Sequence, residues 1–140
     1  MSRVRLADVS AAPLDEGWIA SLVSDHEAGA VVTFAGVVRS RDHDREVLSL
    51  TYEGHPTASQ VLAEVAEAIA DQHDVIAIAV AHRVGALAIG DAALVAAVAS
   101  AHRGEAFRAC QALVDLTKDR LPVWKHQFFA DGTDEWVNCA

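Results

Sequence analysis

Two lysines draw attention first, because they are the only lysines among the eleven basic residues of this 140-residue chain. Lys118 and Lys125 are seven residues apart and lie on either side of Pro122 and Trp124. An amine that is partly removed from water holds its proton less firmly, so it can act as an acid, a base or a nucleophile. This pair is therefore the first candidate for catalysis.

Lys118 lies near the end of a helix that we predict over residues 103–121. Phe107, Cys110 and Val114 have the spacing of one stripe on that helix, and Lys118 follows four residues later. A lysine that continues an apolar stripe is expected to be partly desolvated. The alternative is a helix-end lysine that extends into water and complements the C-terminal dipole.

Lys125 lies on a strand that we predict over residues 123–130. Strand alternation places Gln127 on the same face as Lys125 and His126 on the other face. Both faces carry large apolar groups, so the strand is expected to be buried. A lysine in a buried strand requires an anionic partner or a ligand. A structural ion pair is the alternative to a functional site.

Three further cations stand at predicted strand ends. His102 and Arg103 occupy the junction between a strand over residues 92–102 and the following helix, and Arg39 ends a strand over residues 29–39. A helix N-terminus offers free N–H groups and a positive dipole end, which suit an anion such as phosphate. An arginine is unfavourable there by itself, so it indicates a bound anion. The alternative is that all three cations are simply solvated.

The length of the helix separates these candidates. Arg103 and Lys118 are fifteen residues apart, which is about 22 Å along a helix that rises about 1.5 Å per residue. One chain cannot bring both helix ends into one small pocket. If both ends act on one substrate, two protomers of a homodimer must supply them. The strand over residues 92–102 is apolar on both faces, so it is either central or an interface element.

The remaining pattern predicts an α+β fold with antiparallel sheets and two long helices, in one domain that covers residues 1–140. Strands over residues 29–39 and 47–53 are expected to pair, as are strands over residues 75–85 and 92–102. The other predicted elements are helices over residues 15–25 and 56–74 and a short last strand over residues 135–140.

Composition excludes several classes of protein. The formal net charge of −9 argues against nucleic-acid binding. No apolar run reaches the roughly 20 residues that span a bilayer, and no signal peptide is visible, so we expect a cytoplasmic protein. Cys110 and Cys139 form no spaced motif and are expected to be reduced thiols. The seven histidines show no metal-ligand spacing. We therefore expect neither a metal nor another cofactor.

Several segments together resemble the large, catalytic subunit of molybdopterin synthase. The segments are GAVVTFAGVVR, YEGHPTA, HRVGALAIGD, SAHRGEAF and LPVWKHQFFADGTDEWV, which run in the family's order over residues 29–137. The resemblance implies a fold similar to the α/β hammerhead and a homodimer with one small subunit at each end, which together form a heterotetramer. It implies a sulfurtransferase that converts cyclic pyranopterin monophosphate (precursor Z) to the molybdopterin dithiolene, for molybdenum cofactor biosynthesis. The sulfur donor would be a ubiquitin-like subunit with a C-terminal Gly-Gly thiocarboxylate.

The resemblance also implies roles for particular residues. Lys118 and Lys125 match the family's catalytic lysines, and the pair at positions 102 and 103 comes from the neighbouring protomer. Many members carry a basic residue where Val37 stands and an acid where Gln127 stands. The substrate-binding positions implied in this way are Val37, Val38, Arg39, His102, Arg103, Lys118, Lys125, His126 and Gln127.

Three other functions are compatible with the residues. The first is a non-catalytic module that binds a ubiquitin-like tail. The second is an enzyme that forms a Schiff base between a lysine and another phosphorylated substrate. The third is a purely structural dimer, in which Lys118 and Lys125 would be freely replaceable.

Overall fold

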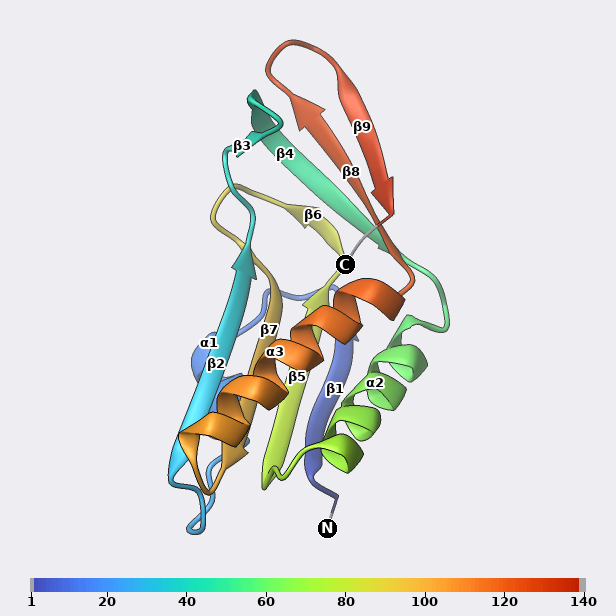
Figure 1. The fold of residues 1–140 in the computed structure, drawn as a ribbon. Coiled ribbons are helices and arrows are strands. Elements are labelled where there is room, and N and C mark those ends of the chain that lie inside the picture. The colour runs from blue at the N-terminus through green and yellow to red at the C-terminus, as the bar shows by residue number, and fades with distance from the viewer. Residues whose placement is uncertain (1, 139–140) are drawn as a thin grey trace.

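The computed structural model describes residues 2–138, which form two sheets and three helices (Figure 1). The first sheet has the order β1 (Val4–Ser10), β5 (Ala77–Arg83), β7 (Ala92–Ser100), β2 (Ala30–Val37). The second has the order β3 (Arg41–Asp42), β4 (Arg45–Gly54), β8 (Val123–Phe129), β9 (Asp134–Asn138), and β6 (Gly85–Leu87) pairs with β4. The helices are α1 (Glu16–Ser21), α2 (Ala58–Gln72) and α3 (Arg103–Arg120). None of these helices is long and apolar enough to cross a membrane.

The central strands β5 and β7 of the first sheet are covered on both faces within one chain. Alternate residues of β5 and β7 point in opposite directions. Ile78 and Val98 face the core beneath α2 and α3, whereas Ala79 and Ala97 pack with Ile19 of α1. The small alanine side chains let the helices approach the sheet closely. The doubly apolar strand over residues 92–102 is therefore explained as a central strand, without a second protomer to cover it.

One predicted pairing is confirmed and one is wrong. β5 and β7 pair antiparallel, as expected for residues 75–85 and 92–102. The strand over residues 29–39 does not pair with residues 47–53, because β2 lies beside β7 and the chain then passes to the second sheet. The residues between these two predicted strands fold back as the β3–β4 hairpin. β4 finds its long partner in β8, far along the sequence.

The N-terminal strand β1 was not predicted, and it pairs parallel with β5. The fold is therefore α+β, with mostly antiparallel sheets and one parallel pair.

Two other expectations concern the cysteines. Cys110 is free and buried, and burial raises the pKa of its thiol to about 11, which makes it unreactive. Cys139, and with it the end of the last predicted strand, lies outside the described residues.

Helix α3 begins and ends within one residue of the predicted bounds, but its buried face differs from the predicted stripe. Cys110, Val114 and Thr117 are buried. Phe107 is 61% exposed, and Lys118 is exposed as well. At 3.6 residues per turn these two side chains lie at the margin of the buried face, not at its centre. The expected desolvation of Lys118 by an apolar stripe is therefore wrong for this chain alone.

Candidate active site

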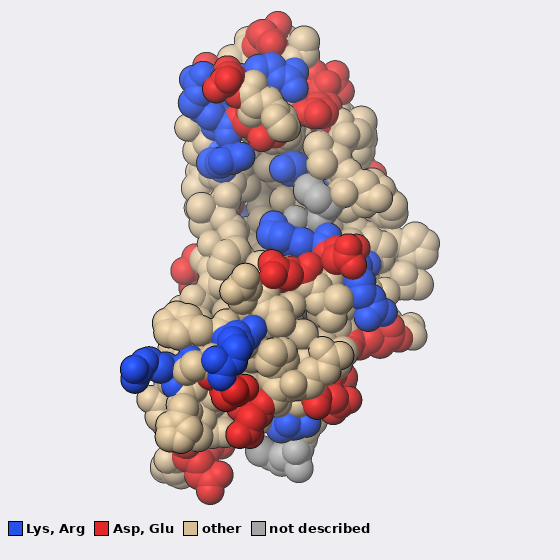
Figure 2. All heavy atoms as spheres, in the orientation of Figure 1, with Lys and Arg blue, Asp and Glu red and all other residues tan. Residues whose placement is uncertain are grey.

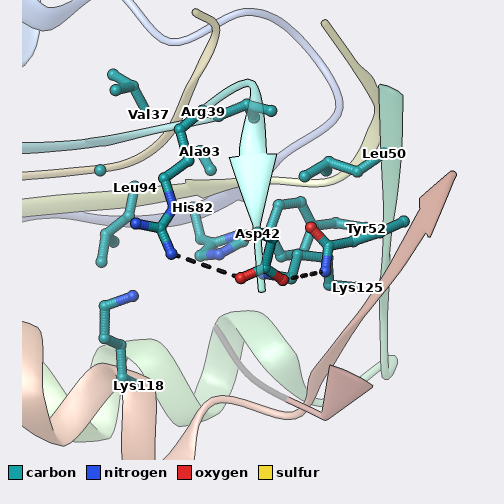
Figure 3. Close-up of a pocket in the computed structure, with 13 residues that line it drawn as sticks. Val37, Arg39, Asp42, Leu50, Tyr52, His82, Ala93, Leu94, Lys118 and Lys125 are labelled. Atoms are coloured by element: carbon teal, nitrogen blue, oxygen red, sulfur yellow. Dashed lines mark hydrogen bonds and ion pairs between the residues drawn. The ribbon is translucent and has the colours of Figure 1, made fainter. Parts of the chain in front are cut away.

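A cavity of about 240 Å³ lies where the two sheets meet, above the C-terminal end of α3 (Figure 3). Its walls come from seven elements or their ends, which are far apart in the sequence. The lining residues are Gly36, Val37, Val38, Arg39, Asp42, Leu50, Tyr52, His82, Ala93, Leu94, Lys118, Lys125 and Gln127.

Three cations converge on this cavity from three different elements. Lys118 reaches up from the last turn of α3, Arg39 follows the end of β2, and Lys125 lies on β8 (Figure 3). The two lysines come together because α3 ends at Arg120 and Pro122 leads the chain directly into β8. Figure 2 shows Lys and Arg atoms gathered at a hollow near the middle of this face of the molecule. A cluster of this kind attracts an anion.

Asp42 is the one carboxylate among the residues that line the cavity. Its Oδ2 accepts a hydrogen bond of 2.7 Å from Gln127 Nε2, and its Oδ1 lies 3.5 Å from Arg39. The hydrogen bond from Gln127 lowers the pKa of Asp42, and the charges of His43, Lys125 and Arg39 act in the same direction against the effect of burial. Asp42 is therefore a carboxylate anion at neutral pH.

His82 lies buried at the base of the cavity. Its Nδ1 is 2.8 Å from the carbonyl oxygen of Arg83, and its ring meets that of Tyr52 edge to face at 4.8 Å. Because a carbonyl only accepts, Nδ1 carries the hydrogen and donates it. Nε2 is buried and has no hydrogen-bond partner. Burial, and then the charge of Lys118, lower the pKa of His82 to about 4 against the effect of the bond to Arg83. The ring is therefore neutral.

Strand β8 presents different chemistry on its two faces, as alternation predicts. Lys125 and Gln127 line the cavity. His126 lies on the other face, where its Nε2 is 2.6 Å from Asp134 Oδ2 and its ring stacks on Trp136 at 4.1 Å. In the single chain His126 therefore lies outside the cavity, because a residue between two inward-facing neighbours on a strand points outward. Its expected part in the substrate pocket stays a prediction.

His102 and Arg103 lie at the opposite end of α3 from Lys118. Both are exposed, and His102 is the N-cap residue but makes no capping hydrogen bond through its side chain. Neither lines the cavity. The separation expected from helix length therefore exists within the chain, and whether a second protomer brings the two ends together stays a prediction.

The sequence and its family resemblance identified six of the thirteen lining residues. Of the seven that were missed, Asp42, Tyr52 and His82 carry polar side-chain groups. His82 could have been noticed in the sequence, because it is the one polar residue in the otherwise apolar run over residues 75–82. Asp42 follows Arg39 by three residues, but only the β3–β4 hairpin turns it inward. Tyr52 lies directly opposite Lys125 in the β4–β8 register, which no local pattern reveals.

The cavity combines three cations, one carboxylate and one neutral imidazole. Such a set can bind an anionic substrate and can move protons through its amines. Among residues 2–138 no three His, Cys, Asp or Glu side chains gather in a way that could hold a metal ion.

The chain is similar to known proteins in both sequence and structure. A family model described as MoaE protein matches residues 9–120. The chain is 37% identical to a molybdopterin synthase catalytic subunit of Aspergillus niger, over 89% of this chain and 69% of that protein. It is 34% identical to the protein of the same name in Bacillus subtilis, over 93% and 83%. Among solved structures, molybdopterin synthase from Staphylococcus aureus superposes with a TM-score of 0.86 at 29% identity, covering 93% of this chain and 95% of that one.

Proposed function

The chain belongs to the MoaE protein family, and from this premise we propose that it is the catalytic subunit of a molybdopterin synthase. It would act as a sulfurtransferase in molybdenum cofactor biosynthesis. Its substrate would be cyclic pyranopterin monophosphate, and its product the molybdopterin dithiolene. The observation that carries the proposal is the convergence of Arg39, Lys118 and Lys125 on one cavity.

The sulfur donor we propose is a small ubiquitin-like subunit with a C-terminal Gly-Gly thiocarboxylate. A thiocarboxylate sulfur is already a strong nucleophile, so the protein need not activate it. The sulfur attacks a substrate carbon and displaces an oxygen from it. In one transfer the carbon–oxygen bond to the cyclic phosphate breaks and the ring opens, and in the other the oxygen of the neighbouring carbon leaves as water. Carrier and substrate are then joined through an acyl–sulfur bond. Water cleaves that bond, which leaves the sulfur on the substrate and releases the carrier as a carboxylate. Two such transfers complete the dithiolene.

Each cation has a separate task in this mechanism. Arg39 holds the cyclic phosphate, and its charge favours ring opening because negative charge develops on the leaving oxygen. Lys118 transfers protons and stabilises the acyl intermediate. Lys118 is exposed in the single chain, so an incoming carrier tail can reach it. Lys125 complements charge near the reacting carbons.

The remaining lining groups would shape the substrate pocket. Val37, Val38 and Gln127 form part of its wall. His82 stays neutral, so it adds no positive charge beneath Lys118. We place His102 and Arg103 of a second protomer at the phosphate, because α3 holds them away from the cavity of their own chain. The assembly would thus be a homodimer that carries one small subunit at each end, in the cytoplasm.

The decisive experiment reconstitutes the reaction. The full chain is mixed with cyclic pyranopterin monophosphate and thiocarboxylated small subunit, and molybdopterin is detected through its fluorescent oxidation product. We expect product only with the thiocarboxylate, so small subunit that ends in an ordinary carboxylate is the control. Absence of product with binding of the carrier intact would favour a non-catalytic docking module. Covalent trapping by borohydride with a carbonyl substrate would favour a Schiff-base enzyme.

A further inference from the structure

Asp42 is an anion inside a site that we propose binds an anion. It comes from the two-residue strand β3 and lies among the cations Arg39 and Lys125, whose charges both act on its carboxyl group. Figure 3 shows a dashed line from the guanidinium of Arg39 to one oxygen of this carboxylate. The other oxygen, Oδ2, accepts the hydrogen bond from Gln127 Nε2. A negatively charged substrate group that approaches these cations must therefore meet the charge of Asp42.

The two contacts of Asp42 differ in strength. The hydrogen bond from Gln127 is short, at 2.7 Å, and joins two side chains that are largely buried. The contact with Arg39 is long, at 3.5 Å, and the Arg39 side chain is 78% exposed. An exposed ion pair of this length contributes little free energy. Arg39 can therefore leave Asp42 for a better anion, whereas Gln127 holds Asp42 in place.

The β3–β4 hairpin restricts how far Asp42 can move away from the cavity. Asp42 pairs with Arg45 across the β3–β4 ladder, and only His43 and Asp44 connect the two strands. Both connecting residues have positive φ, 52° and 62°, which is the conformation of a tight two-residue turn. A carboxylate held by such a turn and by Gln127 stays at the cavity when an anion binds.

We propose that Asp42 is a specificity-determining residue that excludes small free anions, above all inorganic phosphate, from the cation cluster. Its charge offsets one of the three cations and repels any bound anion. A phosphate ester overcomes this repulsion because its organic part makes further contacts with the cavity wall. Inorganic phosphate has no such contacts and is held weakly. The inference rests on the proposed function in one respect, namely that the intended substrate is a phosphate ester.

The test removes the charge of Asp42 and keeps its shape. In Asp42→Asn the side-chain oxygen can still accept the hydrogen bond from Gln127. Inorganic phosphate is titrated into the full-length protein, without carrier or pterin, and binding is measured by calorimetry. We expect the Asn variant to bind phosphate about tenfold more tightly than the wild type, because one nearby like charge is gone.

Asp44→Asn is the matched control. It removes the same charge from the same hairpin, but Asp44 is exposed and does not line the cavity. Asparagine also tolerates the positive φ of this position. We expect phosphate affinity within about twofold of the wild type, because water screens an exposed charge. Equal phosphate affinity in both variants would overturn the proposal.

Two further variants separate the effect of the Asp42 charge from the effect of its hydrogen bond with Gln127. Asp42→Ala removes both, so it should also bind phosphate more tightly, whereas Asp42→Glu keeps the charge and should not. Tighter binding by the Glu variant would overturn the proposal. Failure of the proposed function is distinguishable, because it would appear as absent sulfur transfer in a protein whose phosphate affinity still responds to Asp42→Asn. If the wild type transfers sulfur but Asp42→Asn leaves the phosphate affinity unchanged, the proposed role of Asp42 is rejected and the proposed function stands.

Discussion

The two ends of α3 carry similar residues in different surroundings. At the C-terminal end, Lys118 faces a cavity that also receives Arg39 and Lys125 from other elements. At the N-terminal end, His102 and Arg103 are exposed and line no part of that cavity. One end is therefore a site that a single chain assembles. The other end offers charges that can act on the same substrate only if a second chain brings them to it.

The largest expected effect tests the C-terminal end. Lys118→Ala should slow molybdopterin formation by at least about 100-fold, because general acid–base catalysis contributes about 10²- to 10⁴-fold. Affinity for the small subunit, measured by calorimetry, should remain. Lys118→Arg is the control, since it keeps the charge but does not give up a proton at neutral pH. Product formation at the wild-type rate by the Ala variant would remove Lys118 from the mechanism.

The second-largest expected effect concerns His82, which is buried at the base of the cavity. His82 has a pKa of about 4 in the folded chain and an ordinary value of 6.5. Between these pH values His82 is protonated in the unfolded chain and neutral in the folded chain. The contribution of His82 to the free energy of unfolding is therefore fully present above about pH 6.5 and is lost as the pH falls toward 4. The loss should be about 3 kcal/mol. Urea unfolding between pH 7 and pH 4 measures it, and His82→Phe should flatten the slope. An equally steep slope in that variant would contradict the assignment.

A mixing experiment tests whether the two ends of α3 meet across a dimer. Lys118→Ala and Arg103→Ala chains are each expected to be impaired alone. When they exchange subunits, half of the dimers are hybrids, and each hybrid has one site with both residues intact. Activity should then recover to about a quarter of the wild-type value. Mixing two batches of Lys118→Ala is the control. No recovery after proven exchange would mean that the two ends do not share a substrate across the interface.

The smallest expected effect concerns the outer face of β8. His126→Ala should change the KM for the pterin by less than about twofold, because the side chain contacts Asp134 and Trp136 and does not line the cavity. The loss of those contacts should lower the free energy of unfolding by about 1 kcal/mol. Lys125→Ala, on the inner face, provides the contrast. A tenfold higher KM in the His126 variant would show that His126 reaches the substrate.

Local patterns were sufficient for the parts of this molecule whose structure depends on near neighbours. The bounds of α3 follow from periodicity and Pro122, and the inward direction of Lys125 and Gln127 follows from alternation. Lys118, Lys125 and Gln127 were therefore singled out, whereas Arg39 was assigned to the same site only through the resemblance. The resemblance of several segments to one family added the reaction.

Long-range packing decided what the sequence could not predict. β1 carries polar residues and is a strand because it lies against β5, which is about seventy residues away in the chain. β2 and β4 are neighbours in sequence, yet each pairs in a different sheet. Asp42 and His82 approach the cavity from elements that no local rule connects. Asp42, the one carboxylate of the cavity lining, and the buried His82 were thus the hardest site residues to predict.

The order of the cavity walls along the chain has a consequence for synthesis. Strand β8 supplies Lys125 and Gln127 and pairs with β4, which a ribosome completes some seventy residues earlier. A nascent chain, or one cut short by a premature stop before β8, has neither that wall nor the second lysine. Such a fragment cannot form the cavity. Only a chain that extends through β8 can hold a ligand in this cavity, so fragments that end earlier cannot compete with intact chains for it.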